Sequence, residues 1–297
     1  MFFVLEKIKV NLRFLIIILY GIFYKKKNYK QLFVYHHFNR QKNITNSLNV
    51  DPENFKKQIL YFKKNIKNFI ITIDDADHTV KKVIKFLIYY KIETYISVPL
   101  GFVEDKNSYE YLLSKYLHSK FFNCEKLNDE KFRNILKITS RELKKKLLKI
   151  DKKKNDNVSF REKISKKDLI NLSKFKNIKL VAHGTTHVYL SQINKDWLKW
   201  ELKKSRQLIK KIGGEKFFFV LPYGKKNSFN NNVIMQLKKN KFTKILTNIN
   251  GHGSKNNLFY RNLILNSSNH FYLRGVNSGG NEFFDDIMLS NKRINKK

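Results

Sequence analysis

Short apolar runs alternate along this chain with longer amphipathic stretches. Residues 69–73 (FIITI) form a continuous β-branched run of the kind found in buried parallel strands. Residues 80–88 follow with an apolar stripe at helical spacing and lysines on the opposite face, and residues 92–98 form a second apolar run. The segment 69–98 therefore predicts a strand–helix–strand unit, which implies that its two strands pair in parallel.

The same alternation recurs on both sides of this unit. Further strands are predicted over residues 32–35, 178–182, 217–221 and 244–247. Helices are predicted to begin at Asp51-Pro52 and near Asp196. Repeated alternation of strand and helix is typical of an α/β fold.

The chain has no long linker-like stretch and no internal repeat at solenoid periods. We therefore predict one main domain over residues 30–275, with a charged and mostly helical insertion near 104–176. Residues 276–297 read as a weakly ordered tail, and residues 1–29 as a separate basic and apolar segment.

Residues 14–24 (FLIIILYGIFY) are apolar, with basic residues on both sides. The run is shorter than the roughly 20 apolar residues that span a bilayer, and no small-residue cleavage site follows it. Two interpretations stay open at this point. The segment is either a buried first helix or an interfacial anchor on an anionic membrane surface.

The chain carries 61 Lys and Arg against 24 Asp and Glu, a formal net charge of +37. The lysines are spread among abundant Asn, Ile and Phe, as an AT-rich genome would produce. The same charge would attract anionic lipid or acidic glycan at a cell envelope. No zinc-finger spacing and no ribonucleoprotein-type aromatic motif is present, so we expect no nucleic-acid partner. Cys124 is the single cysteine, so no intramolecular disulfide and no thiolate metal site can form.

The residues that can carry chemistry all come just after predicted strands. They are His36, Asp74, Asp75, His183 and Tyr223. In a (β/α) barrel the active site lies at the C-terminal ends of the strands. We therefore expect these side chains to converge.

His183 and His187 are four residues apart in the sequence HGTTH. On one helical turn, two imidazoles at this spacing lie on the same face and can share a cation. A carboxylate from another strand end, such as Asp75, would complete a site of two histidines and one carboxylate. Such a site holds a divalent metal and leaves positions open for water and substrate.

Three motifs, in this order, resemble those of the polysaccharide deacetylase family, also called NodB-type deacetylases or carbohydrate esterase family four. The family motif Thr-Phe-Asp-Asp-Gly corresponds to Thr72-Ile73-Asp74-Asp75-Ala76. The motif His-(Ser/Thr)-x-x-His corresponds to His183-Gly184-Thr185-Thr186-His187, and Phe-Ala-Tyr-Pro-Tyr-Gly corresponds to Phe219-Val220-Leu221-Pro222-Tyr223-Gly224. The resemblance covers roughly residues 30–265.

The resemblance implies a distorted (β/α) barrel of about seven strands. It implies a hydrolase that removes N-acetyl or N-formyl groups from amino sugars of a surface polysaccharide or lipid-linked glycan. Asp74 would be the general base, and Asp75, His183 and His187 would bind a divalent metal, with zinc expected. The backbone N–H of Tyr223 would help to stabilise the oxyanion.

The chain departs from the family pattern at several positions. Ala76 replaces a Gly, Gly184 replaces a small hydroxyl residue, and Val220 stands where some members carry an Arg. No late Leu-x-His motif supplies the general acid. The candidates for that role are His36, His252 and His270, and we favour His36 because it matches a Tyr-His near the start of many members.

Two other functions compete with this interpretation. Asp75-Ala76-Asp77 fits the Asp-x-Asp motif of metal-dependent glycosyltransferases, but that function would leave HGTTH unexplained. A non-enzymatic, basic protein that binds the cell envelope is the other alternative. For the deacetylase we expect membrane association at a bacterial cell envelope, on a side that the sequence leaves open, or otherwise a cytoplasmic location.

Overall fold

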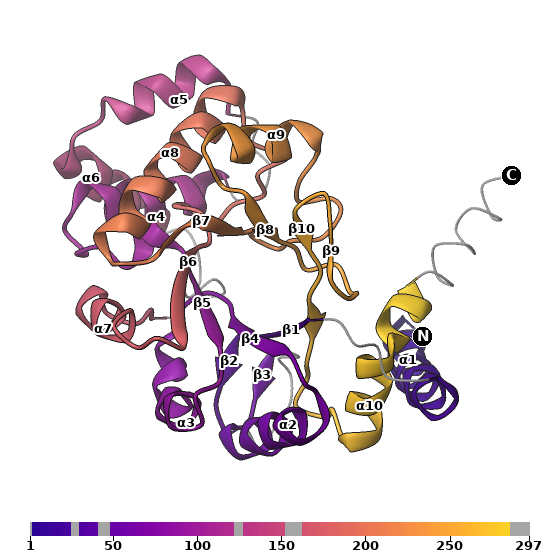
Figure 1. Ribbon diagram of the computed structural model, residues 1–297. Helices are drawn as coiled ribbons and strands as arrows, with labels where there is room; N and C mark the ends of the chain where they lie inside the picture. Colours follow the sequence, from indigo (N-terminus) through magenta and orange to yellow (C-terminus); the bar gives the residue numbers. More distant parts are fainter. Residues whose placement is uncertain (1, 25–29, 41–47, 122–126, 152–161, 286–297) are drawn as a thin grey trace, which may run out of the picture.

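A curled sheet of nine strands forms the centre of the computed structural model, which describes residues 2–24, 30–40, 48–121, 127–151 and 162–285 (Figure 1). The strand order is β11-β1-β4-β5-β6-β7-β8-β10-β9. All neighbours are parallel except β9 and β10. The strands are β1 (Gln31–Tyr35), β4 (Phe69–Ile73), β5 (Thr94–Val98), β6 (Ile178–Ala182), β7 (Glu215–Val220), β8 (Lys244–Leu246), β9 (Ser254–Lys255), β10 (Leu258–Phe259) and β11 (Asn262–Leu263). A separate pair joins β2 (His37–Phe38) to β3 (Asn49–Val50).

The α/β fold predicted from the sequence is confirmed. Each of the six apolar runs that predicted a strand is a strand of the sheet, namely β1 and β4 to β8. The two-residue strands β9 to β11 bring the sheet to nine strands instead of about seven. These short strands carry no periodic pattern from which they could be predicted.

Both faces of the sheet are apolar, as parallel strands require. Residues such as Phe33, Ile71 and Phe219 pack with the helices in the main core. Alternate residues such as Ile70 and Val181 form a smaller cluster made of strand residues. This alternation of side-chain direction decides which strand-end residues point into the curled sheet.

The helices that pack beside the sheet in the main core include α2 (Pro52–Asn65), α3 (Ile84–Tyr89), α8 (Lys195–Lys211) and α9 (Asn231–Lys239). The predicted start at Asp51-Pro52 is confirmed, because the Asp51 carboxylate accepts the Glu53 backbone N–H at 2.8 Å and Pro52 is the first helical residue. Two short 3₁₀ turns, η1 (His78–Lys82) and η2 (Leu100–Phe102), follow β4 and β5.

The span between β5 and β6 holds four helices where the sequence predicted a helical insertion. They are α4 (Tyr109–Phe121), α5 (Asp129–Leu136), α6 (Ser140–Asp151) and α7 (Lys166–Leu172). The first three form an apolar cluster of their own, and Phe132 stacks on the buried Trp197 of α8 at 5.7 Å. The insertion is thereby tied to the helix that follows the HGTTH sequence.

Helix α1 (Phe2–Phe23) packs one face on α10 (His270–Ser278) beside β1 and β11 (Figure 1). Ile17 is fully buried, and Gly21 meets Gly275 so closely that a Cβ on either residue would clash with the other helix. The other face of α1 is exposed. The N-terminal segment is therefore part of the packed structure on one side only.

The packed structure continues past residue 275, where the sequence suggested a tail. Val276 and Asn281 are fully buried, and the Asn281 side chain accepts a hydrogen bond from Arg13 of α1 at 3.0 Å. Residues 286–297 of the predicted tail lie outside the described residues, as does Cys124. Among the described helices, none has the length and apolar character needed to cross a membrane.

Candidate active site

The residues that the sequence predicts for the active site lie at the C-terminal edge of the sheet. Asp74 follows β4, His183 follows β6, Tyr223 follows β7 and His36 follows β1. Because neighbouring strands are parallel, their carboxyl ends share one edge. The predicted convergence of these strand-end side chains is thus seen in the fold.

A left-handed turn after β4 separates the two adjacent carboxylates. Asp75 has φ 72° and Ala76 has φ 44°. Asp74 continues the inward series of Ile70 and Thr72, whereas the turn aims Asp75 at the two histidines. The buried Ala76 accommodates its Cβ in a conformation that costs an L-residue roughly 1–2 kcal/mol.

Asp75, His183 and His187 form one cluster whose candidate ligand atoms all lie within 4.8 Å of one another. Asp75 Oδ1 is 3.1 Å from His187 Nε2 and 3.5 Å from His183 Nε2. The two Nε2 atoms are 3.3 Å apart. Burial opposes ionisation of Asp75, but the facing imidazoles outweigh it and hold the pKa of Asp75 well below its usual range.

Contacts on the side away from Asp75 fix the two imidazoles. His183 Nδ1 donates to the Val220 carbonyl oxygen at 2.9 Å, which leaves Nε2 as the ring nitrogen that faces Asp75. Burial lowers the pKa of His187, which favours the neutral imidazole. Both rings therefore present Nε2 to Asp75, which is the orientation that binding of a shared cation requires.

The HGTTH sequence is a loop, so the idea that a helical turn aligns its histidines is wrong. Gly184 has φ 78° and His187 has φ 52°, and these left-handed residues fold the segment back on itself. The spacing of four residues still brings the two imidazoles together, because the loop turns back and places the His187 ring beside the His183 ring.

Glu201 of α8 holds this loop from inside the protein, and sequence reasoning missed it. The fully buried carboxylate accepts the Thr185 N–H at 2.6 Å, the Thr186 N–H at 2.9 Å and the Thr186 hydroxyl at 2.9 Å. Burial raises the pKa of Glu201. A Cβ at Gly184 would lie 2.8 Å from Glu201 Oε1, so the glycine leaves room for this carboxylate. An acidic residue on the largely apolar face of α8 is the signal that could have identified it.

Asp74 is clamped by Arg261, a second residue that sequence reasoning missed. Arg261 donates to both carboxylate oxygens, at 2.7 and 2.8 Å, and is fully buried. It also donates to Thr247 O at 2.6 Å and Thr72 Oγ1 at 3.0 Å. Burial would raise the pKa of Asp74, but the Arg261 charge outweighs it, so that the pKa lies well below its usual range. Arg261 lies in the segment directly before β11.

His36 is the histidine that the structure brings to Asp74. Its Nε2 is 4.0 Å from Asp74 Oδ2, and the side chain is nearly buried. Burial lowers the pKa of His36 more than the charges of Asp74 and Asp75 raise it. The other two candidates for the general acid make their contacts elsewhere: His252 lies 3.7 Å from Glu282, and His270 stacks on Tyr61.

Asp77 stabilises the turn that follows β4. It accepts the Thr79 N–H at 2.9 Å and the Thr79 hydroxyl at 2.6 Å, capping η1, and it lies 3.5 Å from His37. The carboxylate is fully buried and lies outside the Asp75–His183–His187 group. The Asp-x-Asp interpretation, which needs Asp75 and Asp77 on one metal, therefore does not fit.

Tyr223 borders the cluster from the β7 side. Its backbone is left-handed at φ 62°, its hydroxyl lies 3.4 Å from His187 Nδ1, and its ring stacks on Tyr189 at 4.0 Å. Burial, together with the charge of Asp75, raises the pKa of the Tyr223 phenol well above its usual value. The phenol is therefore protonated at neutral pH.

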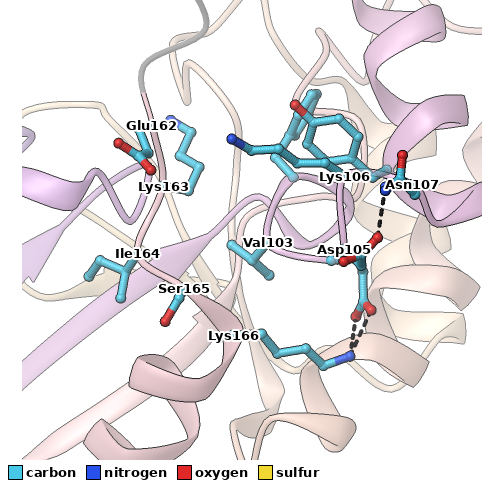
Figure 2. Close-up of a pocket in the computed structure, with 12 residues that line it drawn as sticks. Val103, Asp105, Lys106, Asn107, Glu162, Lys163, Ile164, Ser165 and Lys166 are labelled. Carbon is cyan, nitrogen blue, oxygen red and sulfur yellow. Dashed lines mark hydrogen bonds and ion pairs between the residues drawn. The ribbon is translucent and has the colours of Figure 1, made fainter. Parts of the chain in front are cut away.

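A pocket of about 860 Å³ lies between the segment 102–107 after β5 and the segment 162–166 before α7 (Figure 2). Ile164 N–H donates to Ala76 O at 2.8 Å, and Lys163 forms a β-bridge with Asp77. The cavity wall is therefore attached to the turn that carries Asp75. Lys106 and Lys163 lie on opposite walls, and Lys166 is paired with Glu104 at 2.7 Å (Figure 2).

Comparison with solved structures finds several deacetylases of the same fold. The deacetylase PplD of Streptococcus pyogenes, solved with acetate, is 13% identical with a TM-score of 0.58 over 84% of this chain and 97% of that one. A polysaccharide deacetylase of Bacillus cereus is 14% identical with a TM-score of 0.57, covering 86% of this chain and 70% of that one. IcaB of Ammonifex degensii is 13% identical with a TM-score of 0.56, covering 86% and 98%.

No curated protein matches the sequence. A sequence profile of the polysaccharide deacetylase family, however, matches residues 61–245, which is more than half of the chain. The match begins in α2 and spans all three motifs together with β4 to β8. The chain therefore belongs to the polysaccharide deacetylase family, whose members are hydrolases of carbon–nitrogen bonds.

Proposed function

We propose that this protein is a metal-dependent deacetylase that removes N-acetyl groups from amino sugars within a glycan chain. The observation that carries the proposal is that a possible metal site and a separate carboxylate lie together at the C-terminal edge of the sheet. The Asp75–His183–His187 cluster can hold a cation, and a separate carboxylate, Asp74, lies beside it without belonging to it.

The residues fit a single divalent cation. Two ligands at about 2.0–2.1 Å from a tetrahedral zinc ion lie roughly 3.3 Å apart, and the measured separations in the cluster are 3.1 to 3.5 Å. Two imidazoles and one carboxylate are a donor set typical of catalytic zinc. When bound, such a cation would lower the pKa of a water and polarise the amide carbonyl.

We infer that Asp74 Oδ2 accepts a proton from the attacking water. Oδ1 already accepts from the Ser97 hydroxyl at 2.8 Å and from Arg261, whereas Oδ2 accepts from Arg261 alone among the described residues. The water oxygen would bond to the acetyl carbon as its proton moves to Oδ2. The backbone N–H of Tyr223 would stabilise the negative charge that develops on the carbonyl oxygen.

We infer that His36 protonates the leaving amine. Its Nε2 neighbours Oδ2 of Asp74, so the proton taken from water can be returned through the same pair. The carbon–nitrogen bond then breaks to give acetate and a free amino sugar. This step requires the protonated form of His36. Because burial lowers the pKa of His36, that form is populated on the acidic side of neutrality.

We propose that the cavity of Figure 2 binds the sugars that flank the reacting one. Tyr111 and Phe102 supply ring surface there, and Lys106 and Asn107 supply donors.

Tyr111→Ala should raise KM for an N-acetylglucosamine oligomer by roughly tenfold, the value of one good stacking contact, with little change in kcat. Steady-state kinetics on oligomers and on the monosaccharide would check this, with Tyr89→Ala, an exposed ring elsewhere, as control.

A KM for the oligomer that is unchanged by Tyr111→Ala would exclude the cavity as the binding site for flanking sugars. The result would leave the chemistry at the strand ends untouched.

Glu201→Gln should weaken metal binding by about 10–100-fold, the usual effect of losing an outer-shell partner of a metal site. The amide keeps one oxygen for the two backbone N–H groups, but it presents an NH2 group to the Thr186 hydroxyl and lacks the carboxylate charge, so the anchor of the HGTTH loop is weakened. Competition with a fluorescent chelator measures the affinity, and the cobalt-loaded protein should show an altered visible absorption spectrum. Glu110→Gln, which removes a partly exposed pair with Lys204, is the matched control and should change neither.

The proposed reaction can be tested in the cell that makes this protein. Deleting the gene should leave one additional acetyl group per repeat on a surface glycan, detected by mass spectrometry, and the wild-type gene should remove it again. A shift corresponding to formyl would change the acyl group assigned here. A glycan profile identical with and without the gene would contradict the proposed substrate.

A further inference from the structure

The exposed face of α1 is a continuous apolar stripe. Five of its residues project from one side of the helix with exposed fractions between 42% and 77%: Leu12, Leu15, Leu19, Ile22 and Phe23. At 100° per residue they fall within one arc of about 100°. Every residue of this arc is apolar, which is unusual for the solvent-facing side of a helix.

The opposite side of α1 is fixed to the protein. Ile17 is fully buried, the Phe14 ring stacks on Tyr272 at 4.2 Å, and Gly21 lies against the backbone of Gly275. The stripe therefore belongs to a helix that is held in place by its other face. Exposed Phe283 extends the apolar surface, because its ring contacts Tyr20 at 4.8 Å.

The sequence that contains the stripe is strongly basic. Residues 1–30 contain seven basic residues and a single acidic one, Glu6. Arg274 of α10, next to Gly21, is exposed as well. An apolar stripe with basic flanks is the arrangement by which a helix lies in the interface of an anionic membrane.

We propose that the exposed face of α1 docks this protein onto the surface of an anionic phospholipid membrane, with the helix lying along the surface. The apolar side chains enter the boundary between headgroups and acyl chains, and the lysines neighbour the phosphates. A second copy fits this face less well. A symmetric contact would bring two basic segments together on chains that each carry a net charge of +37.

This docking is independent of the proposed deacetylase reaction, because no residue of the strand-end cluster takes part in it. If both hold, the substrate glycan is one attached to a membrane or held close to it. Binding and turnover are measured separately, so the failure of one is distinguishable from the failure of the other.

Vesicle co-sedimentation of the full chain tests the proposal. Wild-type protein should bind vesicles of phosphatidylglycerol mixed equally with phosphatidylcholine, and bind phosphatidylcholine vesicles much more weakly. Leu15→Gln/Leu19→Gln should weaken binding to the anionic vesicles by roughly 100-fold, about tenfold for each leucine withdrawn from the interface. Both residues are about half exposed, so the melting temperature should change little.

The matched control is Tyr89→Gln/Leu148→Gln, which removes two exposed apolar side chains far from α1 in the sequence. This variant should bind as the wild type does. Equal binding by the stripe variant and the wild type would overturn the proposal, as would equal binding of the wild type to both kinds of vesicle. A wild-type dimer that Leu15→Gln/Leu19→Gln converts to monomer, without vesicle binding, would assign the stripe to a second copy.

Discussion

Asp74→Asn should leave the metal bound and lower the turnover by about 10²–10⁴-fold, the usual value of a general base. The amide keeps an oxygen for Ser97 and Arg261 but cannot accept a proton from water. Metal content and kcat are to be measured on the same preparation. Asp168→Asn, which changes an exposed carboxylate paired with Lys81, should match the wild type in both.

The same substitution should also lower stability, because it leaves the Arg261 guanidinium without a charged partner. Breaking a buried pair of this kind typically costs about 3–5 kcal/mol, and Arg261 is fully buried. The turnover must therefore be measured at a temperature where circular dichroism shows a folded protein. Loss of the metal in folded Asp74→Asn would mean that Asp74 is a ligand and that the two aspartates have exchanged roles.

His187→Ala should reduce bound metal from about one ion per chain to a small fraction, and activity should fall with it. The variant removes one of three ligand atoms that lie within 4.8 Å of one another. Elemental analysis after dialysis gives the occupancy, and excess zinc should restore only part of the activity. His270→Ala, a histidine stacked on Tyr61 away from the cluster, is the control and should keep its metal.

Full metal occupancy in folded His187→Ala would disprove the proposed ligand set. Because the assay measures metal directly, it also distinguishes a lost ligand from an impaired reaction.

The parts of the fold that could be predicted are those with a local signal. Continuous apolar runs predicted β1 and β4 to β8, and the residues that follow these strands include Asp74, Asp75, His183 and Tyr223. The end of each apolar run marks the end of a strand in the sequence. Parallel pairing then brings these strand ends to the same edge of the sheet. His36 is favoured over the other histidines by its match to a Tyr-His near the start of many family members, and it also follows β1.

The parts that could not be predicted depend on distant partners. Arg261 meets Asp74 across 187 positions, next to a strand of two residues that has no periodicity. A clue was present, since the chain has nine arginines among 61 basic residues, and arginine is preferred where a carboxylate is held by two parallel hydrogen bonds.

The N-terminal helix could not be assigned for a related reason. Its apolar run supports both a buried helix and an interfacial one, and only the position of α10 decides which face is covered. Gly21 and Gly275 permit close contact on one side, and the remaining apolar residues stay outside. Sequence periodicity alone contains no information about a partner about 250 residues away.

The central claim is that Asp74 and the Asp75–His183–His187 cluster together hydrolyse an N-acetyl group. Its most direct test is to incubate the zinc-loaded protein with oligomers of N-acetylglucosamine and to measure released acetate and newly formed amine in the same sample. We predict equal amounts of both products from the wild type and essentially none from folded, metal-loaded Asp74→Asn. Equal product yields from wild type and Asp74→Asn, or amine formation without acetate, would contradict it.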